Sequence, residues 1–300
     1  ILRAIAEGRP YSKRAGCEVE VGVKVLPHFP KDTTDRNRTS PFAFTGNKFE
    51  FRMLGSNASI AGPNIILNTI VSESLSQFSE RLEKAQDIMA EVTAIIKDSV
   101  IKHGRIIFNG NNYSAEWVKE AKKRGLSNLV STPDALPHFK DEKNIALFEK
   151  HKVFTREEVI TRTEIMMDNY CKVVHIEALT LSEMLRQDIL PAVSAYIGKF
   201  AKSASAAREL CPDMDISVQK EQLVKLNALY AKAYKGTVKL DSAIKSTEGI
   251  SNLQNKCISY GQNVITAMEN VRKAADELEG VVGSSYWPIP TYGDILFSVK

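Results

Sequence analysis

Residues 46–56, GNKFEFRMLGS, contain an alternating run of charged and aromatic side chains that predicts a β-strand. Successive side chains of a strand point to opposite faces, so Lys48, Glu50 and Arg52 would share one face and the two phenylalanines the other. At ~3.4 Å of rise per residue, the three charged groups would span roughly 14 Å. Such a row is most often an ordinary solvated face of an antiparallel sheet. It can also hold a metal ion and oxyanions together, because it places a carboxylate between two cations.

Strands are expected throughout residues 1–72. Residues 18–25 alternate, with four valines on one face, and two prolines follow them. A Gly62-Pro63 break precedes the first helical pattern. The expected fold class is therefore α+β, with strands and loops over residues 1–72 and a helical domain over residues 73–300.

Three-four spacing of apolar residues predicts long helices beyond residue 64. One stripe runs from Leu75 to Ile96, which indicates a single long helix with one buried face. The stretch Thr155-Arg-Glu-Glu158 matches a capping box, so a further helix is expected to start directly after Thr155. Pro191 either kinks the helical region around it or starts a new helix.

A pair of long helices is expected toward the end of the sequence. Apolar stripes over residues 223–244 and 250–281 keep three-four spacing and are joined by a short link. They predict an antiparallel hairpin over about residues 218–282 with coiled-coil-like packing, which is usually a scaffold or an interface. Tyr286 and Trp287 follow, and we interpret them as anchors that fix the tail to the body of the protein.

The composition is that of an ordinary globular protein and excludes several function classes. The chain has 300 residues, 43% of them hydrophobic, a net charge of +4 and no basic stripe, so nucleic acid is not an expected partner. No apolar run approaches the ~20 residues that a membrane-spanning helix needs, so no membrane association is expected. The sequence has no P-loop and no Gly-x-Ser-x-Gly motif, and its five histidines lack metal-binding spacing.

The cysteines indicate the cellular compartment, and the first residues indicate whether the sequence is a fragment. The four cysteines form no Cys-x-x-Cys pair: Cys17, Cys171, Cys211 and Cys257. The plain interpretation is a reduced, cytoplasmic protein with buried thiols, and two disulfides are the alternative. The sequence opens with Ile1 in what reads as mid-protein sequence, so we expect a fragment.

Several long stretches resemble one enzyme family. Residues 31–56, KDTTDRNRTSPFAFTGNKFEFRMLGS, closely resemble the end of the catalytic barrel of class III glutamine synthetases, with an Asn-Arg-Thr step at residues 37–39. Residues 286–297, YWPIPTYGDILF, resemble the C-terminal signature of that class, and residues 176–181 and 188–193 resemble its C-terminal region. The resemblance implies the end of a glutamine-synthetase-type catalytic β-barrel, followed by a large, mainly α-helical C-terminal domain with the long hairpin.

The resemblance also implies a chemistry and a role for each charged residue. The family joins ammonia to glutamate with ATP, through a γ-glutamyl phosphate. Glu50 matches a metal-ligand glutamate, and Arg52 matches the catalytic arginine that steadies the substrate and the transferring phosphoryl group. Arg38 matches an arginine that contacts nucleotide phosphate. Lys48 stands where better-known classes carry an arginine, and a phosphate contact is expected of it. ATP and Mg²⁺ or Mn²⁺ are the implied cofactors.

Partners and alternatives follow from the same resemblance. Glutamate and ammonia are the implied substrates, and the implied assembly is a homo-oligomer of the large ring type. The family's other metal ligands have no counterpart in the sequence, so the 300 residues alone are expected to be inactive. Two alternatives stay open. One is a helical scaffold or oligomerisation module without catalysis, and the other is another ATP-dependent carboxylate–amine ligase, such as a glutamate–cysteine ligase.

Overall fold

The computed structural model describes residues 2–9, 18–19, 29–30, 42–44, 49–51, 59–108 and 114–297. The chain divides into two compact units. Unit 1 comprises Ile1–Asn128 with Leu147–Val153, and unit 2 comprises Leu129–Ala146 with Phe154–Lys300. The division at residue 72 expected from the sequence stays a prediction. None of the helices in the described part is both long enough and apolar enough to cross a lipid bilayer.

The β-structure of the described residues consists of two short antiparallel pairs: β1 (Glu18–Val19) with β2 (Phe29–Pro30), and β3 (Phe42–Phe44) with β4 (Phe49–Phe51). Each pair is a separate two-stranded sheet. A barrel needs a sheet that closes on itself, and an isolated strand pair is only marginally stable. Because the described residues are otherwise mainly helical, the expected α+β class with the end of a catalytic barrel is wrong. The helical part of that expectation is consistent with the structure.

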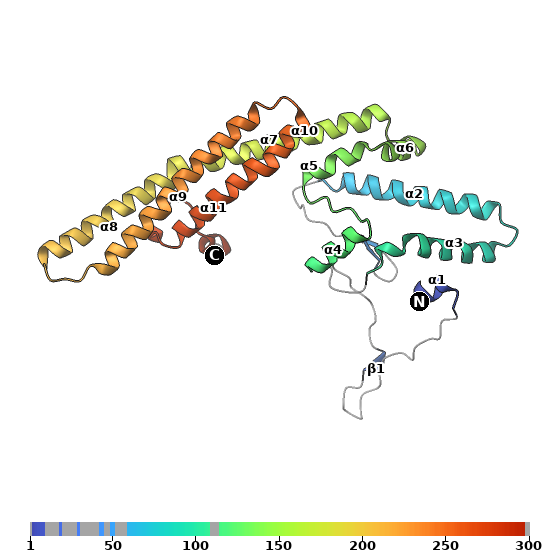
Figure 1. The fold of residues 1–300 in the computed structure, drawn as a ribbon, viewed down its shortest axis with the longest axis horizontal. Helices are drawn as coiled ribbons and strands as arrows, with labels where there is room; N and C mark the ends of the chain where they lie inside the picture. Colours follow the sequence, from blue (N-terminus) through green and yellow to red (C-terminus); the bar gives the residue numbers. More distant parts are fainter. Residues whose placement is uncertain are drawn as a thin grey trace. The chain divides into compact units, whose positions relative to one another are not determined.

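The helices of unit 1 are short or of medium length. They are α1 (Leu2–Glu7), α2 (Ala61–Glu83), α3 (Ile88–His103), the 3-10 turn η1 (Gly104–Ile106), α4 (Ala115–Lys123) and the last turn of α6 (Glu142–Lys150). In Figure 1, α2 and α3 lie side by side, joined by a tight connection, and contacts between them confirm the pairing.

The single helix expected from Leu75 to Ile96 is therefore wrong. Asp87 explains the break, because its side chain accepts hydrogen bonds from the first backbone N–H groups of α3 and so caps a new helix. The stripe is not buried either, since Leu75, Met89 and Ile96 are all exposed. The three-four spacing continued across a turn that the spacing alone could not reveal.

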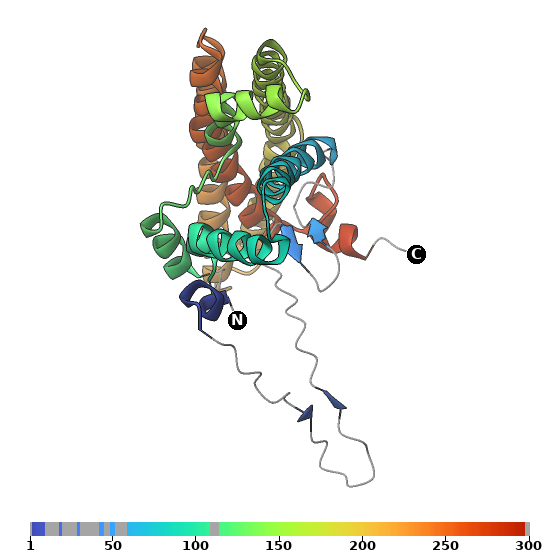
Figure 2. The ribbon, with the colours of Figure 1, turned by 90° about the vertical axis from the view of Figure 1, so that its right-hand side faces the viewer.

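Unit 2 is a bundle of long helices around one apolar core. Its elements are α5 (Thr132–Ala135), η2 (Leu136–Lys140), the start of α6, α7 (Arg156–Met184), η3 (Leu185–Ile189), α8 (Leu190–Leu210), α9 (Ser217–Glu248), α10 (Leu253–Ser259), η4 (Tyr260–Val264), α11 (Ile265–Glu279), η5 (Ser284–Tyr286) and α12 (Tyr292–Leu296). In Figures 1 and 2 the long helices, coloured from yellow-green to red, run side by side. α9 packs against α7, α8 and α11, and its three-four stripe, which includes Leu240 and Ile244, supplies the core together with Val271 and Leu278 of α11.

The start of α7 confirms the predicted capping box. The Thr155 hydroxyl accepts a hydrogen bond from the Glu158 backbone N–H, and the Glu158 carboxylate accepts one from the Thr155 backbone N–H. α7 continues through η3, a π-helical turn, into α8, whose first turn contains Pro191. Proline lacks the N–H that an uninterrupted α-helix needs, and the π-helical turn directly before it accommodates the change.

α9 and α11 approach each other closely at Gly236. A Cβ atom on this residue would lie 3.1 Å from Val271 Cγ2, so a larger residue would require the Val271 side chain to move slightly. Opposite α9 the chain forms η4, a second π-helical turn, and its first and last residues, Tyr260 and Val264, are both buried. The apolar stripe of residues 250–281 therefore stays in the core through a turn that is not α-helical.

The tail confirms the anchoring role expected for Tyr286 and Trp287. Trp287 is buried and belongs to the core of unit 2. The ring of Tyr286 lies 5.2 Å from that of Tyr196, and Lys199 Nζ lies 5.0 Å above it. These contacts attach the segment after α11 to α8.

Candidate functional site

The residues predicted to carry chemistry lie almost entirely outside the described residues. Arg38, Lys48 and Arg52 belong to parts of the chain that the structure does not describe. Glu50 is the middle residue of β4, and its backbone pairs with that of Ala43 in β3. The strand expected over residues 48–52 is thus present for its three central residues, whereas the roles of the four side chains stay predictions.

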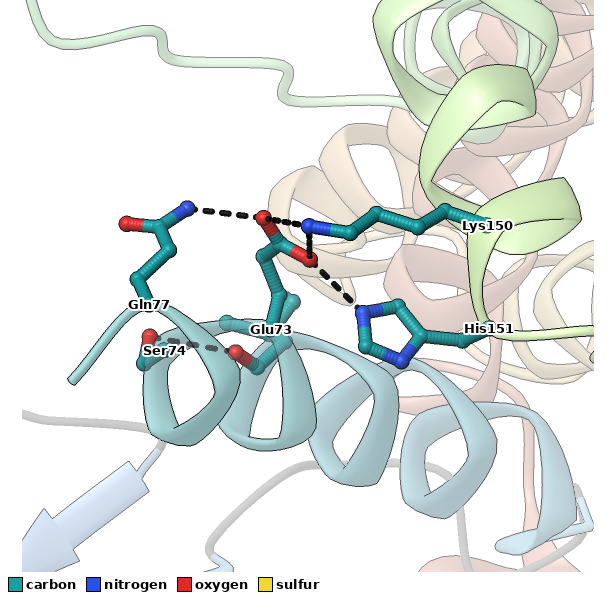
Figure 3. Close-up of polar contacts among 6 residues, drawn as sticks. Glu73, Ser74, Gln77, Lys150 and His151 are labelled. Carbon is teal, nitrogen blue, oxygen red and sulfur yellow. Dashed lines mark hydrogen bonds and ion pairs between the residues drawn. The ribbon is translucent and has the colours of Figure 1, made fainter. Parts of the chain in front are cut away.

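Unit 1 brings four polar residues together in its described part (Figure 3). The Glu73 Oε1 atom accepts hydrogen bonds from Lys150 Nζ at 2.9 Å and from Gln77 Nε2 at 2.7 Å. The Oε2 atom lies 2.7 Å from His151 Nε2 and 2.8 Å from Lys150 Nζ. We call Glu73, Gln77, Lys150 and His151 the Glu73 cluster.

The local structure explains how these side chains meet. Glu73 and Gln77 lie one helical turn apart, which places both on the same face of α2. Lys150 is the last residue of α6, and His151 follows it directly. Lys152 then adopts a left-handed backbone with φ of 54°, the conformation that commonly ends a helix. The cluster thus joins α2 to the end of α6, with His151 and Glu73 separated by 78 positions in the sequence.

The electrostatics of the cluster favour a structural role. The hydrogen bond from Lys150, followed by those from Gln77 and His151, lowers the pKa of Glu73 to about 2. The same pairing raises the pKa of Lys150. A general base is most effective when its pKa lies near the working pH, so a carboxylate this acidic is a poor proton acceptor at neutrality. We interpret the cluster as a charged clasp between two helices.

A second polar chain lies within unit 2. The hydroxyl of Tyr260 lies 3.1 Å from His175 Nδ1, and His175 Nε2 lies 3.5 Å from Glu248 Oε1. π-helical turns such as the one that starts at Tyr260 are frequent at functional sites. Burial raises the pKa of Tyr260, so the phenol stays protonated at neutral pH and its hydroxyl is already paired. This chain is best explained as a link that fixes η4 against α7.

The part of the chain that the structure describes contains no group of three or more His, Cys, Asp or Glu side chains arranged to hold a metal ion. The Glu73 cluster itself was not predicted from the sequence. Its one local signal is the spacing of Glu73 and Gln77. The partners on α6 lie too far along the chain for any periodic pattern to reveal them.

Comparison with known proteins identifies relatives of both the strand segment and the helices. Residues 91–208 match the family model described as the glutamine synthetase C-terminal domain. The chain is 40% identical to a type-3 glutamine synthetase of Dictyostelium discoideum over 291 residues, which cover 93% of this chain and 39% of that protein. It is 36% identical to a glutamine synthetase of Butyrivibrio fibrisolvens over 306 residues, covering 100% of this chain and 43% of the relative.

A glutamine synthetase of Bacteroides fragilis (strain YCH46) is 31% identical over 291 residues, covering 93% of this chain and 40% of that protein. The chain thus spans only about two fifths of the length of the curated relatives that it matches. The similarity extends over nearly all of the chain, including the segment that contains Glu50, and is not confined to the helices.

Proposed function

We propose that this chain is part of a type-3 glutamate–ammonia ligase, because it is similar to glutamine synthetases over nearly its whole length. That enzyme would join ammonia to glutamate with ATP, through a γ-glutamyl phosphate. The observation that carries the proposal is the 40% identity to a type-3 glutamine synthetase over 93% of the chain. A helical scaffold alone would not need similarity that extends through the charged strand at its other end.

The proposed roles follow from the chemistry that phosphoryl transfer requires. Divalent metals bridge the phosphates, and cations neutralise the charge that develops on them. Glu50 supplies the hard oxygen ligand that Mg²⁺ or Mn²⁺ prefers. Arg38 and Lys48 are proposed to contact the phosphates of ATP, and Arg52 to steady the glutamate substrate and the phosphoryl group.

These four residues provide one metal ligand, Glu50, and three cations that can contact phosphate or substrate. They do not make a complete metal site. One carboxylate does not satisfy a divalent cation, so further ligands would come from residues other than these four. When bound, the metal would neutralise charge on the phosphates during transfer. We propose that residues 1–72 carry the catalytic side chains and that residues 73–300 form the helical body.

The proposed assembly is a homo-oligomer of the large ring type, with glutamate and ammonia as substrates. The helices over about residues 218–282 are proposed as a contact surface of that assembly. Long paired helices usually serve as scaffold or interface, which supports this role.

The proposal is tested by charge reversal at Glu50 in the full-length enzyme that contains this chain. We expect Glu50→Lys to reduce glutamate- and ammonium-dependent ADP release at least ~100-fold, because several kcal/mol of metal-derived stabilisation correspond to that factor. Glu50→Gln should need much more Mg²⁺ or Mn²⁺ for half-maximal activity. Glu209→Lys is the matched control, since Glu209 is an exposed glutamate at the end of α8.

Two outcomes would replace the proposal. A Glu50→Lys enzyme with unchanged activity and unchanged metal dependence would show that the charged strand face is only solvated, as a scaffold module predicts. Turnover with an amino acid amine in place of ammonia would instead indicate another carboxylate–amine ligase. Circular dichroism of each variant separates loss of chemistry from loss of folding.

A further inference from the structure

Two cysteines that are distant in sequence meet in the core of unit 2. Cys171 lies on α7 and Cys257 on α10, 86 positions later, and their sulfur atoms are 3.3 Å apart. The two helices are in contact. Both thiols are free and buried, with exposed fractions of 5% for Cys171 and 0% for Cys257.

The hydrogen bonds of the pair fix the direction of its protons. The Cys257 thiol lies 3.4 Å from the backbone carbonyl oxygen of Met167 and donates to it. A thiol has one proton, so the Cys257 sulfur can then only accept from Cys171. The Cys171 thiol therefore donates to the Cys257 sulfur, and the two sulfur atoms are in direct contact.

The surroundings of the pair are apolar. Cys171 and Cys257 belong to the same core as Met167, Val174 and Tyr260. Burial, followed by the hydrogen bond with Cys171, raises the pKa of Cys257 to about 12, so this residue stays a thiol at neutral pH. The slightly exposed Cys171 is therefore the sulfur that a small oxidant reaches first.

We propose that Cys171 and Cys257 form a peroxide-driven disulfide that locks α10 onto α7. Hydrogen peroxide is small enough to enter where a bulky disulfide oxidant is excluded. It would convert the Cys171 thiol to a sulfenic acid, with release of one water. The Cys257 sulfur then attacks the Cys171 sulfur, and the sulfenic hydroxyl leaves with the Cys257 proton as a second water. The two sulfurs together lose two electrons, which reduce the peroxide.

The lock has a defined mechanical consequence. Sulfur atoms in a disulfide lie ~2.05 Å apart, so the pair closes by an approach of little more than an ångström from 3.3 Å. α10 has only seven residues and leads directly into the π-helical turn η4, so it is a segment that can absorb such a shift. The covalent loop would enclose α8 and α9, which are in contact with each other. Closing a long loop restricts the unfolded chain and stabilises the fold.

The test maps disulfides directly. The protein is reduced, exposed to hydrogen peroxide, denatured in an alkylating reagent and digested without reduction. Mass spectrometry is expected to find a linked peptide pair containing Cys171 and Cys257. The oxidised protein should also unfold at a higher temperature than the reduced protein, and dithiothreitol should reverse that shift. Neither measurement requires a variant to fold.

Variants make the assignment specific. Cys257→Ala should abolish both the linked peptide and the thermal shift, while Cys211→Ala should leave both unchanged, because Cys211 is an exposed free cysteine beyond the end of α8. The proposal is overturned if peroxide leaves both Cys171 and Cys257 open to alkylation after denaturation. A Cys171 sulfenic or sulfinic acid without a link, or a link to Cys17 or Cys211, overturns it as well.

Discussion

The helices of unit 2 meet through a continuous apolar core, whereas the described helices of unit 1 bury few hydrophobic side chains fully and are also joined by ion pairs. In unit 2 the core extends from α7 to the tail segment around Trp287. In unit 1 the buried hydrophobic side chains among the described residues are Ile95 and Phe148. The two units therefore depend on different interactions for their cohesion.

Two groups of ionic contacts join helices within unit 1. One is the Glu73 cluster. The other is Arg81 at the end of α2, which donates to Glu91 at 2.6 Å and to Asp98 at 3.0 Å, both on α3. Hydrophobic burial involves no ionised groups, so charge screening and protonation do not weaken it, whereas exposed ion pairs are weakened by both. The stabilities of the two units should therefore respond differently to core substitution, to pH and to salt.

The largest effect is expected for a core residue of unit 2. Leu240 on α9 is completely buried, and Leu240→Ala should lower the free energy of unfolding by ~2–5 kcal/mol through lost burial and a residual cavity. Urea denaturation followed by circular dichroism measures this change. Leu210→Ala is the matched control, because Leu210 is the last residue of α8 and has an exposed fraction of 85%.

A Leu240→Ala protein as stable as the wild type would contradict the central place of this helix in the core. Equal losses for the two leucine variants would contradict it too, since the control removes the same atoms from solvent-exposed surface. A loss confined to Leu240→Ala sharpens the comparison, because the charged contacts of unit 1 are untouched by it.

The sequence predicted unit 2 far better than unit 1, because the signals that define the helices of unit 2 are local and periodic along the chain. Helix stripes such as Leu226, Ala233 and Leu240 are local and periodic, and a capping box lies within four residues, so both are readable along the chain. The turn at Asp87 was missed because apolar spacing happens to continue across it. The π-helical turns were missed because they keep the same residues buried.

The candidate site was less predictable from the sequence for a different reason. The row of Lys48, Glu50 and Arg52 could be recognised by alternation and resemblance, and the β4 strand agrees with that pattern. The resemblance, however, implied the end of a barrel, which the described strands do not form. The Glu73 cluster depends on tertiary proximity alone, for which no periodic signal exists.

A smaller effect is expected for the Glu73 cluster, and it depends on pH. The pKa of Glu73 is lowered from an ordinary 4.5 to about 2, so the carboxylate stabilises the fold above pH 4.5. That contribution is lost progressively as the pH falls from 4.5 through 2. Glu73→Gln should therefore lower the thermal unfolding midpoint at neutral pH and match the wild type near pH 2.

Thermal scans of both proteins between pH 7 and pH 2 measure this difference. Glu83→Gln is the control, because Glu83 is an exposed glutamate at the end of the same helix. A wild-type advantage that stays constant down to pH 2 would show that the side-chain shape matters and not the charge. If the wild type is no more stable than Glu73→Gln at any pH, the Glu73 cluster does not stabilise unit 1.

The smallest effect is expected for Arg81, whose side chain is 40% exposed and is therefore strongly screened by solvent. Arg81→Met keeps much of the aliphatic stem and removes the donors to Glu91 and Asp98, so it should lower the unfolding midpoint slightly at low salt. Raising the salt from ~0.1 M to ~1 M shortens the screening length from about 10 Å to about 3 Å, which should remove the difference. Thermal scans of the two proteins at both salt concentrations measure it, with exposed Arg208→Met on α8 as the matched control. A deficit that persists unchanged at ~1 M salt would mean that α2 and α3 are held by packing, and the contrast between the two units would then be one of degree.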